Sequence, residues 1–167
     1  MLKKRFRVLV LGNSGSGKTT AAEIIAEMLD SPPPRNCSDF IIEDYACSIA
    51  STPMKKLNLA KKILANKNEY RQELFKYGLA RQKTDPAYPV SEAVRHTDVV
   101  TGVRTLENLN ASKNLFDLIL WINRIATSAG STDKLKPEHA DVVIDNNGSI
   151  KDLETNLRMI LIREMTN

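Results

Sequence analysis

The period of the apolar residues changes several times along the chain, and each change marks an expected element. Residues 6–12 read FRVLVLG, a continuous apolar run that ends at a glycine, as expected for a strand covered on both faces of a parallel sheet. In AAEIIAEML (21–29) the apolar positions recur every three or four residues, which predicts a helix. The prolines of DSPPPR (30–35) end it, because proline donates no backbone hydrogen bond.

The next part of the chain is more ambiguous. NCS (36–38) predicts a short second strand. The apolar residues after it fit either a strand over 40–42 or a helix that starts near Ser38 or Asp39, and their four-residue spacing favours the helix. Residues 54–82 then read as one lysine-rich helical stretch.

Strand and helix patterns alternate through the second half. DVVTG (98–102) and FDLILWIN (116–123) predict buried strands, and DVVID (141–145) predicts a final strand. Helices are expected from Ser91, over 105–114, and after a capping box formed by Ser149 and Asp152. This alternation predicts an α/β fold in which helices flank a mostly parallel, five-stranded sheet.

The composition fits one ordinary domain over residues 1–167. The chain has 42% hydrophobic and 26% charged residues and a net charge of +4, which suits an anionic ligand without indicating nucleic acid. Cys37 and Cys47 have neither the spacing of a disulfide framework nor that of a zinc site. No apolar run approaches the roughly 20 residues that span a bilayer. We therefore expect a soluble, cytoplasmic protein with no membrane partner.

The stretch LGNSGSGKTT (11–20) carries the clearest chemical signal. It fits Gly-x4-Gly-Lys-[Ser/Thr] between an expected strand and an expected helix, the context in which backbone amides cradle phosphates. Lys18 is placed to reach the β- and γ-phosphates, and the Thr19 hydroxyl to ligate Mg²⁺. We therefore expect a three-layer P-loop NTPase fold that binds ATP with Mg²⁺. The expected nucleotide-binding residues of this phosphate loop are Gly12, Asn13, Ser14, Gly15, Ser16, Gly17, Lys18, Thr19 and Thr20.

Phosphoryl transfer onto a second phosphate requires further cations, because it brings two anions together. Arg71 shares a helix face with Leu74, Phe75 and Gly78, so it is either a ligand-binding cation on an apolar stripe or a snorkelling arginine. Arg104 and Arg124 follow the carboxyl ends of expected strands, where ligands bind in parallel sheets.

Ser38, Asp39 and Arg81 are weaker candidates for the acceptor side. Ser38 and Asp39 come at the expected end of the second strand and suit either substrate binding, Mg²⁺ positioning through water, or a helix N-cap. Arg81 lies near the edge of the apolar stripe. Many P-loop enzymes carry an Asp at the end of the third core strand, where this chain has Thr101-Gly102. The nearest acid, Asp98, is at the beginning of that expected strand, which leaves Mg²⁺ with few protein ligands.

Five stretches together resemble the deoxynucleoside monophosphate kinases of bacteriophages. They are GNSGSGKTT, YRQELFKYGLARQKTDPAYPV, VVTGVRTLENL, LFDLILWINR and ADVVIDNNGSIKDL. The resemblance implies transfer of the ATP γ-phosphate to a (deoxy)nucleoside 5′-monophosphate, a helical acceptor-binding insert over 39–90, and a lid over 125–140. It also implies that Arg71 and Arg104 contact the acceptor phosphate.

The resemblance has further implications for the donor and the partners. Asn147 and Gly148 are similar to a loop that supports the donor adenine, although a plain turn explains them as well. The expected partner is a small nucleotide and not nucleic acid, and the protein is expected as a monomer or homodimer. Another small-molecule P-loop kinase, for example one acting on dephospho-coenzyme A, and less readily a P-loop ATPase or switch protein, remain alternatives.

Overall fold

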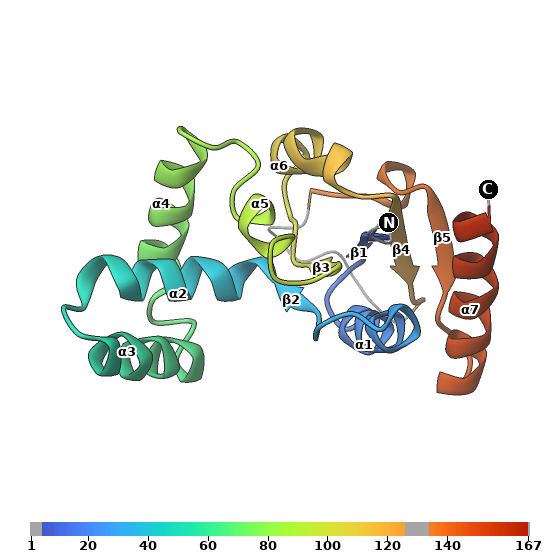
Figure 1. Cartoon of the computed structure of the whole chain (residues 1–167), viewed down its shortest axis with the longest axis horizontal. Helices are drawn as coiled ribbons and strands as arrows, with labels where there is room; N and C mark the ends of the chain where they lie inside the picture. Colours follow the sequence, from blue (N-terminus) through green and yellow to red (C-terminus); the bar gives the residue numbers. More distant parts are fainter. Residues whose placement is uncertain (1–4, 126–133, 167) are drawn as a thin grey trace.

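The computed structural model describes residues 5–125 and 134–166, which form a parallel five-stranded sheet flanked by helices (Figure 1). The strand order is β2-β3-β1-β4-β5, with every pair parallel. This confirms the expected α/β architecture. The strands are β1 (Val8–Leu11), β2 (Arg35–Asn36), β3 (Val99–Thr101), β4 (Leu118–Asn123) and β5 (Val142–Asp145).

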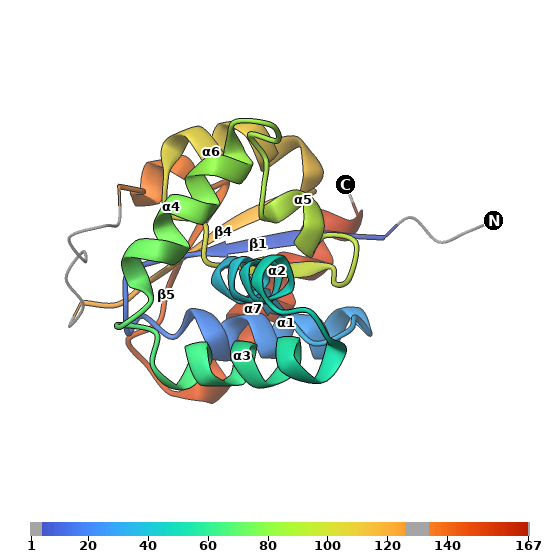
Figure 2. The same ribbon diagram turned by 90° about the vertical axis from the view of Figure 1, so that its left-hand side faces the viewer.

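Helices cover both faces of the sheet, and Figure 2 shows α6 on one side of it and α1 on the other. Short 3₁₀ turns follow α6 (Lys113–Leu115) and precede β5 (Pro137–His139). Among the described residues, no helix is long and apolar enough to cross a membrane. The helices are α1 (Lys18–Leu29), α2 (Cys37–Ile49), α3 (Pro53–Ala65), α4 (Arg71–Gln82), α5 (Val90–Ala93), α6 (Leu106–Ser112) and α7 (Ile150–Thr166).

The unbroken apolar run of β1 explains its central place in the sheet. Successive side chains of a strand point to opposite faces, so Val8 and Val10 pack with α1 and α7 while Leu9 and Leu11 pack with α5 and α6. All four are buried. A strand that is apolar on both faces is stable only where helices cover both, and this fixes the phosphate loop at the carboxyl edge of the sheet.

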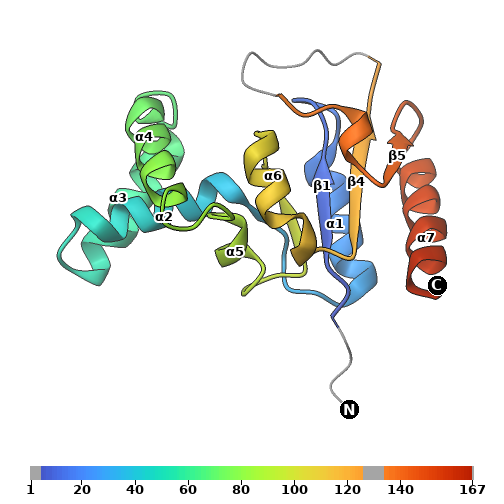
Figure 3. The same ribbon diagram turned by 90° about the horizontal axis from the view of Figure 1, so that it is seen from above.

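Helices α2, α3 and α4 form a separate unit beside the sheet, joined to it through α2 (Figure 3). The unit has its own small core of Ile42, Ala46, Ala60 and Ile63. It occupies most of the span that the sequence assigned to the helical insert.

The structure corrects the extent of two expected elements. The expected second strand exists but ends two residues earlier than NCS, since β2 covers Arg35–Asn36. The Asn36 side chain accepts a hydrogen bond from the Ser38 amide at 3.0 Å and so starts α2. Residues 54–82 are not one helix, because α3 ends at Ala65 and α4 begins at Arg71. The Asn66 side chain donates to the Lys62 carbonyl at 3.1 Å and closes the end of α3.

Candidate active site

The phosphate loop (residues 12–19) joins β1 to α1 through three glycines with positive φ. The φ values are 146° at Gly12, 76° at Gly15 and 93° at Gly17, a region that side chains disfavour. A Cβ at Gly12 would lie 2.5 Å from the Ile122 carbonyl oxygen. The loop therefore keeps its shape only with glycine at these turns.

The loop fits a polyphosphate by two observations. Within the described residues, no side chain caps the amide end of α1 and no acid lies in its first turn, so these donors suit an anionic ligand. The hydroxyl of Ser16 is buried without a hydrogen-bond partner, and Lys18 donates from Nζ to the Asn13 carbonyl at 2.5 Å. The loop is thus preformed, with Lys18 folded onto it.

Asn146, which the sequence analysis did not single out, supports this loop from the end of β5. Its Nδ2 donates to the Ser16 carbonyl at 2.9 Å, and its backbone amide donates to the Asn123 carbonyl at 2.7 Å. A Cβ at Gly17 would collide with the side-chain amide of Asn146. Its place directly after the last strand, at the carboxyl edge of the sheet, was the available signal.

Arg104 and Arg124 come after the two strands that flank β1, the strand that leads into the phosphate loop. β3 and β4 are the two neighbours of β1 in the sheet, and the arginines follow the carboxyl ends of β3 and β4. Both residues are exposed. The sheet order thus puts the segments that carry Arg104 and Arg124 at the same edge of the sheet as the phosphate loop.

The described ends of the expected lid attach at this edge as well. The Ile125 amide donates to Oδ1 of Asn147 at 3.0 Å, and the Lys134 amide donates to the Arg104 carbonyl at 3.3 Å. Residues 126–133, the middle of the expected lid, lie outside the described residues. Gly148 follows Asn147 in the turn before α7, where the Ser149–Asp152 capping box forms with bonds of 2.8 and 3.2 Å.

The first turn of α2 carries Ser38 and Asp39 beside the end of β3. Gly102 has a φ of 90° and approaches the Asn36 side chain so closely that a Cβ would collide with it. Asn36 is the N-cap, so Ser38 and Asp39 are not needed for that role. Lys67, which the sequence analysis overlooked, reaches them from the turn before α4, with Nζ 3.2 Å from Oδ1 of Asp39.

The two arginines of α4 lie on different faces of the helix. Nε of Arg81 lies 3.0 Å from Oδ2 of Asp44 on α2. That carboxylate raises the pKa of Arg81. Arg71 is exposed, and Phe75 beside it is 64% exposed, so the apolar stripe that includes Arg71 is largely open to solvent. The stripe is buried only at its edge, where Gly78 meets α2.

Carboxylates are sparse at the loop. Among the described residues no three Asp, Glu, His or Cys side chains gather in a way that could hold a metal ion. Asp98 precedes β3 at the opposite edge of the sheet, with Oδ1 3.9 Å from Arg5. The chain's own candidate ligand for Mg²⁺ is therefore the Thr19 hydroxyl, with the phosphates and water supplying the rest.

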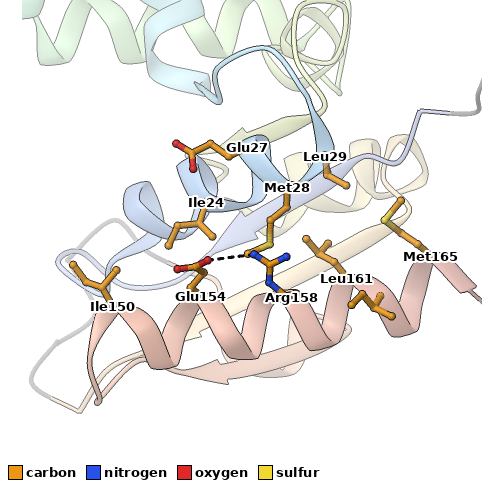
Figure 4. A pocket seen from close by; sticks show the side chains of 10 residues that line it. Ile24, Glu27, Met28, Leu29, Ile150, Glu154, Arg158, Leu161 and Met165 are labelled. Atoms are coloured by element: carbon orange, nitrogen blue, oxygen red, sulfur yellow. Dashed lines mark hydrogen bonds and ion pairs between the residues drawn. The ribbon is translucent and has the colours of Figure 1, made fainter.

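A separate groove of about 460 Å³ runs between α1 and α7 (Figure 4). Its lining is mainly apolar, including Ile24, Met28 and Leu161, and its charged groups include Glu154 and Arg158, which pair at 3.3 Å. This groove lies on the outer surface of two helices and does not include the phosphate loop.

Comparisons with known proteins give similarity in structure only. No family model matches the chain, and no curated protein matches its sequence. The shikimate kinase of Aquifex aeolicus has a TM-score of 0.54, at 16% identity over 93% of this chain and 96% of that chain. A shikimate kinase from Bacteroides thetaiotaomicron and a sugar kinase from Janibacter sp. have TM-scores of 0.48 and 0.47, at 12% and 15% identity, over 93% of this chain and 98% and 94% of theirs.

At this identity the similarity establishes the fold alone and leaves the activity and the substrate open. The match to the Aquifex aeolicus enzyme extends over nearly the whole of both chains. The chain has the P-loop kinase fold.

Proposed function

We propose that this protein is an ATP-dependent kinase that transfers the γ-phosphate to a (deoxy)nucleoside 5′-monophosphate, giving ADP and the diphosphate. The observation that carries the proposal is the uncapped amide end of α1, with Arg104 and Arg124 in the segments that follow β3 and β4, the two neighbours of β1 in the sheet. The fold shared with small-molecule kinases supports the same class of reaction.

The donor side of the reaction follows from the phosphate loop. Its amides and Lys18 hold the β- and γ-phosphates, and the Thr19 hydroxyl is a ligand for Mg²⁺, which supplies charge neutralisation when bound. Asn147 and Gly148, beside Ile125, are assigned to the donor adenine. Asn146 keeps the loop in place through its bond to Ser16.

The acceptor side follows from the arginines. Two unit charges about 4 Å apart interact by about 4 kcal/mol at an effective dielectric of 20, so two phosphates approach only where cations offset the repulsion. Arg104 and Arg124 do this at the transferring group, and Arg71 holds the acceptor phosphate from α4. Ser38 and Asp39 orient the acceptor. Arg81 was also expected at the substrate, and this stays a prediction beside its observed pair with Asp44.

A phosphate acceptor is already ionised at neutral pH, so this reaction requires positioning and charge neutralisation more than a general base. The preference for deoxynucleotides rests on the resemblance to the bacteriophage kinases alone. The segment 125–140 is assigned as a lid that excludes water.

A second candidate is phosphorylation of a hydroxyl on a small acid or sugar, favoured by the structural similarity to shikimate kinase. A hydroxyl acceptor must lose a proton, and Asp39, beside Lys67, is the carboxylate at the end of β2 that would take it. The two candidates therefore differ in whether Asp39 acts as a base.

An acceptor panel tests the proposal. ADP release is measured with ATP and Mg²⁺ and, in turn, deoxynucleoside monophosphates, ribonucleoside monophosphates, dephospho-coenzyme A and shikimate. We expect turnover above the ATP-only rate with at least one nucleoside monophosphate, and we expect Asp39→Asn to leave the pH dependence of its kcat unchanged. If shikimate or dephospho-coenzyme A raises the rate of ADP release and no nucleoside monophosphate does, the nucleotide assignment is wrong.

A further inference from the structure

One face of α4 bears an arginine and an aromatic ring that the helix does not use for packing. Arg71 and Phe75 are one turn apart, and Gln82 follows on the same face two turns later. The other face, with Tyr77 and Arg81, packs on α2 through a ring contact of 5.4 Å with Tyr45 and through the Arg81–Asp44 pair.

Hydrogen bonds at the end of α4 show what lies beside the face that bears Arg71, Phe75 and Gln82. Nε2 of Gln82 donates to the Tyr88 carbonyl at 3.0 Å, and Nδ2 of Asn108 on α6 donates to the same oxygen at 2.9 Å. At its Gln82 end, this face of α4 is therefore joined through the Tyr88 carbonyl to α6, which begins at Leu106 shortly after Arg104.

The first turn of α4 also lies toward the phosphate-binding edge. Figure 2 shows the start of α4 on the same side of the molecule as the start of α1. Arg71, in that first turn, is thus the end of the face nearest the transferring group. Phe75 stands one turn farther from that edge.

The exposure of Phe75 is unusual for a ring in this position. A phenylalanine ring has a large apolar surface, and that of Phe75 is 64% exposed and is continued by Leu79, which is 46% exposed. Side chains one turn apart are about 5–6 Å apart at Cβ, which matches an acceptor that joins a phosphate to a flat ring through one sugar. A polyhydroxylated acceptor would leave this apolar surface without a matching group.

We propose that Phe75 is a specificity-determining residue of the acceptor site, where its ring stacks on the nucleobase while Arg71 holds the phosphate. This inference rests on the proposed function and names the part of the acceptor that the site recognises. The aromatic face excludes acceptors that lack a planar ring. It also predicts that purines, with the larger ring system, bind more tightly than pyrimidines.

The test compares Phe75→Ala and Phe75→Trp with the wild type, using dGMP, dTMP and 2-deoxyribose 5-phosphate as acceptors. Base–aromatic stacking weakens roughly 10- to 100-fold on alanine substitution. We expect Phe75→Ala to raise the KM for dGMP by that factor while the KM for ATP is unchanged, and Phe75→Trp to restore it. Leu64→Ala, which changes an exposed apolar residue of α3, is the matched control.

A binding measurement separates the possible failures. The fluorescence of the indole introduced by Phe75→Trp, taken as the difference from the wild type with its buried Trp121, should be quenched by dGMP and not by 2-deoxyribose 5-phosphate. If the wild type phosphorylates a nucleoside monophosphate but Phe75→Ala changes no KM by more than twofold, the inference about Phe75 is wrong and the proposed function stands. If no nucleoside monophosphate is bound or phosphorylated by the wild type, both are wrong.

Discussion

Nζ of Lys67 lies 3.2 Å from Oδ1 of Asp39, so the turn before α4 is joined to the first turn of α2. The same ammonium lies 3.4 Å from Oγ of Ser38. Both members of the pair are partly exposed, at 46% and 33% for their side chains, and exposed pairs contribute about 0–1 kcal/mol to stability. We therefore expect this pair to matter through its position at the end of β2, on the acceptor side, more than through its contribution to stability.

Lys67→Ala should weaken acceptor binding with little effect on folding. Losing a charge-assisted contact near the acceptor corresponds to roughly a tenfold rise in acceptor KM, while the ATP KM and the melting temperature change little. Lys61→Ala, at an exposed lysine of α3, is the control. Steady-state kinetics with both substrates check this, and an acceptor KM equal in both variants would restrict Lys67 to a structural tether.

Arg104→Ala should lower turnover far more than it lowers ATP affinity. Removing a group that stabilises transition-state charge costs about 100- to 1,000-fold in kcat, and we expect Arg124→Ala to act in the same direction. The control is Arg95→Ala, because Arg95 is 70% exposed and pairs with Glu92 at 3.2 Å. Equal losses of kcat and of ATP affinity, the latter measured by calorimetry, would remove Arg104 from the acceptor side.

The sequence predicted the parts of this fold that depend on local pattern. FRVLVLG and FDLILWIN are short runs that are apolar at nearly every position, as expected of strands between two helical layers. They contain the strands β1 (Val8–Leu11) and β4 (Leu118–Asn123). The glycines of the phosphate loop are likewise needed for local backbone reasons, since their φ values are positive.

The parts that the sequence did not predict depend on contacts between distant segments. Lys67 is one of many lysines in a polar stretch, and only the fold brings it to Asp39, 28 positions earlier. Asn146 reaches Ser16 across 130 positions. Helical periodicity predicts which side chains share a face with Arg71, but it does not predict how far they are buried. Their burial depends on where α2 lies against α4.

Two glycine substitutions should change stability in opposite directions. Gly12→Ala forces a Cβ against the Ile122 carbonyl at a φ of 146°, so we expect a loss of about 1–3 kcal/mol in the free energy of unfolding and no ATP binding. Gly78 lies inside α4, where alanine is more favourable than glycine by about 0.5–1 kcal/mol. In Gly78→Ala the new Cβ lies 3.4 Å from the flexible end of the Ile41 side chain on α2. Urea unfolding checks both, and a destabilised Gly78→Ala would mean that α4 cannot yield by the small distance required.

Asp44 contacts other side chains of the insert, among them Tyr88 and Arg81. It accepts a hydrogen bond from the hydroxyl of Tyr88 at 3.0 Å and pairs with Arg81, whose guanidinium lies 5.1 Å from the centre of the Tyr88 ring. Tyr88 is only 2% exposed. Burial and the negative charge of Asp44 together raise the pKa of Tyr88 above its ordinary value, and the same two causes raise the pKa of Tyr77.

These raised pKa values predict that the protein loses stability at alkaline pH. The unfolded chain releases its phenol protons near pH 10, while the folded chain retains those of Tyr77 and Tyr88. The free energy of unfolding therefore falls as the pH rises past that value. The contribution is complete below about pH 10 and is lost above it.

Tyr88→Phe should cost roughly 1–3 kcal/mol at pH 7, because Asp44 loses a hydrogen bond, and this difference should shrink above pH 10. Urea unfolding from pH 7 to 11 measures it, with the double variant Tyr77→Phe/Tyr88→Phe removing both groups. An alkaline slope identical in the wild type and the double variant would show that other groups cause it.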